Sequence, residues 1–274
     1  MPFIKRRLLL LSVLVLIVAL AAGGVFLLQK QKPQAQTLPQ PTPSPEPAYP
    51  KVNSYQVPIL MYHYIRNAEG ESELGKSLSV TPENFAAQVQ WLKDNNYETL
   101  KVSDLVDPQR KILSKIYFAK KKPIILTFDD GYADAYTEAL PILKKYQAVA
   151  TFYLIRDYVG KGNYLSQTQT QELEKAGMEI GSHTLSHPDL TKINLEDAQT
   201  QIFQSKENAL TFCYPSGKYD STTVRLVQEA GFQAAVTTHF GIADQNSSIL
   251  ELPRVRVEDG SGETLKNKIE AAHE

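Results

Sequence analysis

Short apolar runs alternate with amphipathic stretches along most of the chain after residue 56. These runs are rich in β-branched and aromatic residues and are bounded by turn-forming residues, which is typical of buried β-strands. Seven segments fit this description: 57–64, 124–128, 150–155, 178–181, 210–214, 234–237 and 252–257. The pattern therefore predicts seven short strands in one domain that spans residues 57–274.

Helix-start signals lie between several of these predicted strands. Thr81 and Pro82 indicate an N-cap and a first-turn proline of a helix that runs to about Asn95. A second helix is predicted over residues 132–146, with a bend at Pro141. Further helices are expected after Ser166 (ending at Gly177), near Asn194 and near Asp220. Seven strands with intervening helices predict an α/β fold, a distorted parallel (β/α) barrel of about seven strands.

The N-terminal segment differs from the rest of the chain. An apolar run of 21 residues, 8–28, follows Lys5, Arg6 and Arg7. As a helix this run spans roughly 30 Å, about the thickness of a bilayer core. Residues 1–28 are therefore predicted to be a single-pass cell-membrane anchor, with the rest of the chain outside the cytoplasm. The alternative is a signal segment that is cleaved near 19–21, which would leave a secreted protein.

The next segment, residues 29–56, is predicted to be a Pro-rich extracytoplasmic linker. Seven prolines lie between Pro33 and Pro50, mixed with Gln, Thr and Ser. This composition favours an extended polyproline II chain and does not form a core. Such a linker holds a domain away from the membrane that anchors it.

The overall charge of the chain limits which kinds of binding partner are expected. The chain has 29 basic and 30 acidic residues, so it lacks the strongly basic character of a nucleic-acid-binding protein. Its single cysteine, Cys213, excludes an intramolecular disulfide. We therefore expect no nucleic-acid partner, and a fold stabilised by packing and a bound metal.

Candidate chemistry follows two of the predicted strands. Asp129 and Asp130 come directly after 124–128, and His183 and His187 come after 178–181. In parallel barrels the carboxyl ends of the strands gather at one face, so these side chains are expected to meet. Two imidazoles and one carboxylate leave coordination positions open for water and substrate, as catalytic metal sites require. The alternative is an aspartate that caps a helix and two solvated loop histidines.

These motifs resemble those of the polysaccharide deacetylases of the NodB-homology type, carbohydrate esterase family four. Residues 127–131 resemble the first motif of that family, TFDDG, and residues 183–187 resemble its second motif, H[ST]xxH. The resemblance covers most of residues 57–274. It implies that Asp130, His183 and His187 bind a divalent metal ion, usually zinc, and that Asp129 is the catalytic base.

A third similarity concerns His63. Residues 58–64 resemble the late leucine/histidine motif of the family, placed before the TFDDG motif instead of after it. That circularly permuted order is found in the branch that acts on poly-N-acetylglucosamine. The resemblance implies that His63 is the catalytic acid, whereas a histidine on a buried strand is more simply a core residue.

The sequence departs from the family pattern at the third motif, RxPY. Cys213 occupies the arginine position, and the backbone N–H of Tyr214 is expected by resemblance to help hold the oxyanion. Arg254 and Arg256 alternate along one predicted strand and so share a face. One hypothesis is that Arg254 supplies the missing charge beside Asp129; the alternative is a charge pair on an edge strand.

Together these features predict an enzyme, a hydrolase of non-peptide carbon–nitrogen bonds. It is expected to deacetylate N-acetylglucosamine-containing polysaccharide at the cell surface, releasing acetate and leaving a free amine. Tyrosines near strand ends are candidates for a sugar-binding groove: Tyr64, Tyr132, Tyr214 and Tyr219. Three alternatives stay open: a carbohydrate-binding protein without turnover, a cysteine hydrolase that uses Cys213, and a deacetylase of peptidoglycan, chitin-like oligomers or acetylated xylan.

Overall fold

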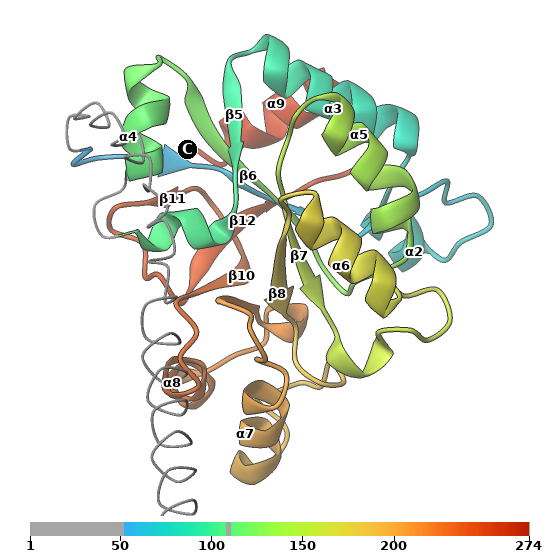
Figure 1. The fold of residues 1–274 in the computed structure, drawn as a ribbon, viewed down its shortest axis with the longest axis vertical. Coiled ribbons are helices and arrows are strands. Elements are labelled where there is room, and N and C mark those ends of the chain that lie inside the picture. The colour runs from blue at the N-terminus through green and yellow to red at the C-terminus, as the bar shows by residue number, and fades with distance from the viewer. Residues whose placement is uncertain (1–51, 108–110, 274) are drawn as a thin grey trace, which may run out of the picture. The chain divides into compact units, whose positions relative to one another are not determined.

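The computed structural model describes residues 52–107 and 111–273, which form a closed ring of parallel strands surrounded by helices (Figure 1). Around the ring the strands follow the order β2 Ile59–Tyr62, β12 Leu252–Arg256, β10 Ala234–Phe240, β9 Thr211–Cys213, β8 Glu179–Ser182, β7 Thr151–Leu154 and β6 Lys122–Phe128. The ring closes because β6 also pairs with β2. The structure therefore confirms the predicted parallel barrel of seven strands.

The barrel is irregular, as the sequence predicts. The register between β10 and β12 shifts between Val236 and Phe240, and β8 pairs with β9 only through Ser182 and Phe212. An eighth parallel strand, β5 Tyr97–Leu100, pairs with the first half of β6. β5 was not predicted, since its first two residues are only partly buried and it has no continuous apolar run.

The predicted strand 57–64 is divided into three short strands. Before β2 lies β1 Gln56–Val57, which pairs antiparallel with β11 Ala243–Asp244. After β2 lies β3 Tyr64–Ile65, which pairs with β4 Ser79–Val80. His63 occupies the break between β2 and β3. His63 is therefore not part of a strand and lies at the end of the barrel strand β2.

Four helices begin where the sequence predicts. Side chains of Thr81, Ser166, Asn194 and Asp220 accept a backbone N–H from the first turn of the helix that each caps. The helices are α3 Pro82–Asp94, α6 Gln167–Lys175, α7 Leu195–Phe203 and α8 Ser221–Glu229. Three further helices were not predicted: α2 Glu73–Leu78, α4 Lys111–Phe118 and α9 Gly262–Ala271.

The helix expected over residues 132–146 is irregular at a different place than the predicted bend at Pro141. A π-helical turn, Ala135–Ala139, leads into α5 Leu140–Lys145, and Pro141 lies in the first turn of α5. Because proline has no N–H, it is best tolerated in a first turn, where intrahelical hydrogen bonds are not yet formed. The irregularity therefore precedes Pro141 instead of lying at it.

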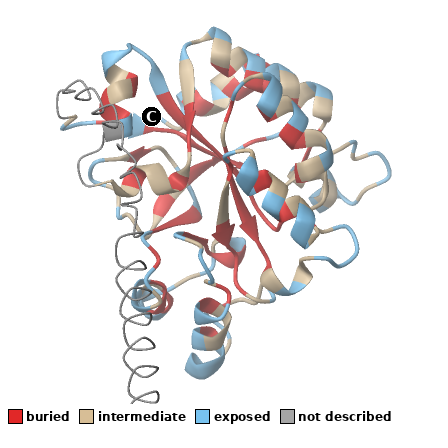
Figure 2. Ribbon diagram, in the orientation of Figure 1, coloured by how far each residue is buried: buried red, intermediate tan, exposed pale blue. Residues whose placement is uncertain are grey.

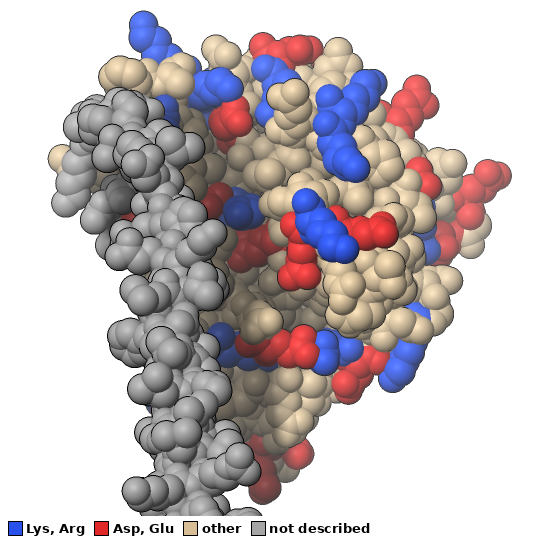
Figure 3. Space-filling model, in the orientation of Figure 1, with Lys and Arg blue, Asp and Glu red and all other residues tan. Residues whose placement is uncertain are grey.

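The core lies between the strands and the helices, where the buried residues in Figure 2 follow the central strands. All residues of β6 from Pro123 to Phe128 are buried, as expected for a parallel strand covered on both faces. Phe128 stacks on Phe152 of β7, with ring centroids 4.7 Å apart. On the face shown in Figure 3, basic and acidic side chains are interspersed over the described residues. The burial of β6 and the stacking of Phe128 on Phe152 hold the strand ends that carry the polar motifs in place.

Within residues 52–107 and 111–273, the structure contains no helix that is both long enough and apolar enough to cross a bilayer. The predicted anchor or signal segment, 1–28, lies outside the described residues, as does the predicted linker up to residue 51. The described residues therefore test only the predicted domain that follows the linker, residues 57–274.

Candidate active site

The polar residues singled out in the sequence lie at the carboxyl ends of neighbouring strands. Asp129 and Asp130 follow β6, His183 follows β8, and His63 follows β2. Arg254 lies on β12, which is hydrogen-bonded between β2 and β10. These strand ends lie at one end of a parallel barrel, so residues far apart in the sequence come together there.

Asp130, His183 and His187 form a group that suits a divalent metal ion. The Asp130 Oδ1 atom lies 3.4 Å from His183 Nε2 and 3.6 Å from His187 Nε2. One donor atom from each of the three residues lies within 4.8 Å of the others. Two imidazole nitrogens and one carboxylate oxygen are ligands that zinc and similar ions bind, and the set leaves positions open. The structure thus brings together the predicted ligand set.

The backbone at this group adopts unusual conformations. The φ angles of Asp130, Thr184 and His187 are 71°, 66° and 62°, in the left-handed region that residues with a Cβ avoid. Gly131 continues the turn with a φ of 79°, and a Cβ there would lie 2.7 Å from Leu154 Cδ2. Strained backbone of this kind is held in place by its surroundings and clusters at functional sites.

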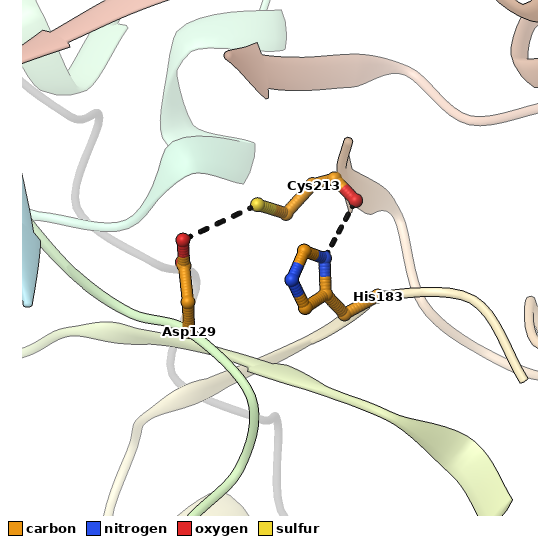
Figure 4. A group of neighbouring side chains, drawn as sticks. All are labelled: Asp129, His183 and Cys213. Atoms are coloured by element: carbon orange, nitrogen blue, oxygen red, sulfur yellow. Dashed lines mark hydrogen bonds between the residues drawn. The ribbon is translucent and has the colours of Figure 1, made fainter. Parts of the chain in front are cut away.

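His183 is oriented by a hydrogen bond from its second ring nitrogen. Its Nδ1 lies 2.7 Å from the carbonyl oxygen of Cys213. Figure 4 shows this hydrogen bond. A carbonyl only accepts, so Nδ1 must carry the hydrogen, and the neutral ring then has its lone pair on Nε2. The ring is therefore prepared to offer Nε2 to a metal ion next to Asp130.

Asp129 is held by Arg254 in a fully buried, two-point ion pair. Arg254 Nη1 donates to Asp129 Oδ1 at 2.8 Å, and Nη2 donates to Oδ2 at 2.7 Å. The guanidinium also donates to Thr127 Oγ1 at 2.9 Å and, through Nε, to the Thr237 carbonyl at 2.7 Å. β12 is an internal strand, so the alternative of a charge pair on an edge strand is wrong. The structure places a positive charge beside Asp129, where Arg254 was expected to supply it.

This ion pair controls the charge of Asp129. Burial raises the pKa of Asp129, but the charge and hydrogen bonds of Arg254 outweigh burial. The net effect holds the pKa of Asp129 well below its ordinary value. Asp129 is therefore a carboxylate at neutral pH and can accept a proton.

His63 faces the same carboxylate. Its Nε2 atom lies 3.9 Å from Asp129 Oδ2, and 14% of its side chain is exposed. Burial lowers the pKa of His63, while the nearby charges of Asp129 and Asp130 oppose that change. Because His63 lines the cavity at the strand ends, the alternative of a core histidine does not describe it.

Cys213 is buried next to the charged side chains of Asp129 and Arg254. Its Sγ atom points toward Asp129 (Figure 4) and lies 3.5 Å from Asp129 Oδ2. The same atom lies 3.3 Å from Arg254 Nη2, and the residue is fully buried. Burial raises the pKa of the thiol, which disfavours the nucleophilic thiolate. Donor atoms of Asp129, His183 and Cys213 also lie within 4.8 Å of one another, but the adjacent guanidinium repels a cation there.

A cavity of about 590 Å³ opens over these groups. Its lining includes all five predicted catalytic and metal-binding residues: His63, Asp129, Asp130, His183 and His187. The rest of the wall includes Tyr132, which was predicted for a groove, and residues for which no role in the site was predicted: Leu74 and Leu78 of α2, Ser216, Thr238 and Arg256. Nothing in the sequence pattern indicated that α2 would lie at this rim.

The expected role of the Tyr214 backbone needs a correction. Its N–H donates to the Val236 carbonyl at 3.3 Å, and its hydroxyl donates to the Leu250 carbonyl at 3.0 Å. Tyr214 is thus engaged in the sheet and the core. Ser216 lines the cavity instead, in a left-handed conformation with a φ of 52°. With Cys213 in the arginine position of RxPY, Ser216 takes the last position of that motif, which the sequence could have indicated.

Of the four tyrosines proposed for a groove, Tyr132 lines the cavity and stacks on Tyr64, with ring centroids 3.8 Å apart. Tyr219 stacks on the buried Tyr214 at 4.6 Å. The structure therefore groups them into two separate pairs. Only the Tyr64–Tyr132 pair includes a residue of the cavity wall.

Comparison with known proteins gives a consistent result. The family model described as "Polysaccharide deacetylase" matches residues 118–235. The putative polysaccharide deacetylase YxkH of Bacillus subtilis (strain 168) is 35% identical over 227 residues, which cover 79% of this chain and 77% of the relative. A poly-beta-1,6-N-acetyl-D-glucosamine N-deacetylase of Staphylococcus aureus (strain MRSA252) is 25% identical over 246 residues, 78% of this chain and 83% of that protein. The solved structure of the Streptococcus pyogenes deacetylase PplD in complex with acetate matches with a TM-score of 0.71 and 33% identity, covering 80% of this chain and 99% of that one.

Proposed function

The chain belongs to the polysaccharide deacetylase family of hydrolytic N-deacetylases, and we propose that it removes acetyl groups from an N-acetylglucosamine-containing polysaccharide at the cell surface. A relative that is 25% identical is named as a poly-beta-1,6-N-acetyl-D-glucosamine N-deacetylase, which supports this substrate class. The position of His63 before the Asp129–Asp130 motif is compatible with the permuted branch. The observation that carries the proposal is the meeting of Asp130, His183 and His187 beside the Asp129–Arg254 pair.

We infer that Asp130, His183 and His187 hold the divalent ion that is typical of the family, and that this ion is zinc. When bound there, the ion supplies a Lewis acid that polarises the acetyl carbonyl and lowers the pKa of a water toward about 7. The nitrogen and oxygen donors, the fixed ring of His183 and the open cavity all suit this role.

Three other residues of the site transfer protons or stabilise negative charge. Asp129, ionised and held by Arg254, accepts the proton of the attacking water. His63, whose lowered pKa leaves the ring neutral at pH 7 and whose Nε2 lies 3.9 Å from Asp129 Oδ2, takes over that proton and gives it to the departing sugar amine. The backbone N–H of Ser216 is the candidate donor for the negative charge on the carbonyl oxygen. The products are acetate and a free amine on the sugar.

Arg254 bears on the alternative of a binding protein without turnover. Such a protein is suggested by the loss of the motif-three arginine at Cys213. Arg254, which comes from β12 instead of β9, provides the two-point contact to Asp129. We therefore favour an active enzyme in which Arg254 is the residue that positions the base.

The test is acetate release by the full-length protein. Poly-β-1,6-N-acetylglucosamine and peptidoglycan are offered separately, with and without zinc, and with a chelator. We expect release from the first polymer, its loss on chelation, and its loss in Asp130→Ala. Asp94→Ala, an exposed aspartate at the end of α3, is the matched control and should keep full activity. No release from either polymer would refute the proposed function, whereas release only from peptidoglycan would change the substrate.

We also propose that residues 1–28 anchor the chain as a single pass in the cell membrane, with the catalytic domain outside the cytoplasm. The basic residues before the apolar run support this orientation. Fractionation of cells that express the full chain tests it. The protein should stay with the membrane and be open to protease from outside. Release of a shortened protein into the medium would instead indicate cleavage and secretion.

A further inference from the structure

The two histidines of the proposed metal site are confined to different degrees. The His183 side chain is 2% exposed, and its Nδ1–H donates to the Cys213 carbonyl at 2.7 Å. The His187 side chain is 30% exposed, so fewer packing contacts surround its ring. The position of His187 therefore depends more on the backbone of the loop that carries both histidines, residues 183–187.

This loop has an unfavourable backbone. Thr184 and His187 both have φ angles in the left-handed region, and a β-branched residue such as Thr184 is especially disfavoured there. Backbone of this kind persists only where surrounding contacts determine it. The loop therefore needs hydrogen bonds from other parts of the fold to keep its shape.

Gln201 of α7 supplies such hydrogen bonds through its side-chain amide. Its Oε1 accepts the N–H groups of Leu185 and Ser186 at 3.1 and 3.0 Å. Its Nε2 donates to Ser186 Oγ at 2.9 Å. All three bonds fall on the two residues that lie midway between His183 and His187, so this one side chain holds the segment that joins the two ligands.

Helix α7 is itself tied to the strand that precedes the loop, and in Figure 1 it lies beyond the arrowhead of β8. Ser182, the last residue of β8, donates to Ser205 Oγ at 2.8 Å, and Ser205 donates to the Ile202 carbonyl at 3.0 Å. Both serines are buried, as are Ala198 and Ile202 of α7. A side chain on this fixed helix therefore places the loop more precisely than a contact from another loop would.

The loop is also bonded on a second side, by main-chain groups. The N–H groups of Arg156 and Asp157 donate to the carbonyls of Thr184 and Leu185 at 3.0 and 2.9 Å. These bonds use the carbonyl groups of the loop, whereas Gln201 Oε1 accepts from its N–H groups. The two sets of contacts therefore do not duplicate each other.

We propose that Gln201 is a positioning residue of the metal site, which holds residues 185 and 186 so that His187 Nε2 stays beside Asp130 and His183. The inference rests on the proposed function, because it takes these three residues as the ligands of the ion. Gln201 contacts neither the ion nor the substrate. It raises the affinity of the site for zinc and leaves the chemical step unchanged once zinc is bound.

Two substitutions of Gln201 separate hydrogen bonding from packing. Gln201→Met has a similar volume but no oxygen acceptor, and Gln201→Glu keeps an acceptor for both N–H groups. The Kd for zinc is measured on the full-length protein by competition with a chromophoric chelator. We expect it to rise about 10–100-fold in Gln201→Met, as for other contacts that orient a metal ligand, and to stay close to the wild-type value in Gln201→Glu.

Gln199, an exposed glutamine on the same helix, offers matched controls. Gln199→Met controls for the change of side chain and Gln199→Glu for the added charge, and both should leave the zinc Kd unchanged. At saturating zinc, kcat for acetate release by Gln201→Met should return to the wild-type value. A kcat that stays low would overturn the positioning role, because added metal does not rescue a loop that has lost its structure.

An unchanged zinc Kd in Gln201→Met would overturn the inference. So would an equal rise in Gln201→Glu, since the acceptor would then be unimportant. If Gln201→Met does not fold, Gln201→Asn, which is one methylene too short to reach the loop, decides in the same way. Weaker zinc binding by Gln201→Met without any acetate release by the wild-type protein would support the positioning role and refute only the proposed function. A wild-type protein that binds no zinc would overturn both.

Discussion

Replacing Arg254 with methionine separates the two forces that act on Asp129. In the wild-type protein the Asp129 carboxylate is 4% exposed and the Arg254 side chain is fully buried, with contacts of 2.7 and 2.8 Å between them. Methionine fills part of the same volume but carries no charge. The carboxylate of Arg254→Met would therefore be buried without a counter-charge.

The expected loss of stability is large. Removing one partner of a buried ion pair costs about 3–5 kcal/mol, because the other charge remains desolvated. Arg254 also satisfies Thr127 Oγ1 and the Thr237 carbonyl, and both would lose a donor. We expect the free energy of unfolding at pH 7 to fall by about 3–5 kcal/mol.

The pH dependence has a definite sign. In the wild-type protein the pKa of Asp129 is lowered, so the ion pair contributes stability above the unfolded pKa of about 3.9, and this contribution is lost as pH falls through the folded value. In Arg254→Met, burial alone would raise the pKa of Asp129. Its stability should then decrease as pH rises. The difference between the two proteins should therefore widen between pH 4 and pH 7.

Urea unfolding at several pH values, with a chelator present, measures this difference. Arg254→Met combined with Asp129→Asn should recover more than half of the lost free energy, since the unpaired charge is then absent. A loss below about 1 kcal/mol at pH 7, the size expected of a surface pair, would refute the reasoning. So would a loss that is independent of pH.

Three further predictions concern other parts of the molecule. His183→Ala and His187→Ala should each abolish stoichiometric zinc binding, measured by metal analysis after dialysis, and retention of about one ion per chain in either would contradict the ligand set. Gly217→Ala should lower the free energy of unfolding by about 2–4 kcal/mol, because its φ is 66° and the new Cβ would lie 1.8 Å from Thr238 Oγ1. Gly177→Ala, with a φ of 88° and open space around it, should cost only about 1 kcal/mol, and equal losses would show that the Thr238 contact is unimportant. Asp134→Asn should be more stable than the wild-type protein by about 1–2 kcal/mol at pH 7.5 and equally stable near pH 4, because the raised pKa of about 6 makes the wild-type protein lose stability as pH rises through 4 to 6; a pH-independent difference in urea unfolding would contradict this.

Much of the barrel was predictable because local signals agree with the tertiary structure. Ring strands such as β2, β6 and β7 are largely apolar runs that are buried on both faces, and four helices begin at residues whose side chains cap them. β5 was missed because its burial comes from its place beside β6 and not from its own composition. Helix α2 was missed for a related reason: it has no buried residue and so leaves no apolar stripe in the sequence.

The site was predictable where chemistry follows strand ends, and less so where it depends on contacts across the barrel. Asp130, His183 and His187 could be grouped from their positions after two strands. The contact of Arg254 with Asp129 was only a hypothesis, since alternation along β12 does not tell which face points inward.

The order of strands around the ring has a consequence for when activity appears during folding. β2 lies between β12 and β6, so His63, Arg254 and Asp129 meet only when the earliest and the latest barrel strands pair. Contacts this distant in sequence form slowly, because the entropy of closing a long loop is lost before the contacts stabilise the fold. A growing or prematurely terminated chain thus lacks the arginine that positions its base. Competence for hydrolysis therefore arises late in folding, when β12 pairs with β2.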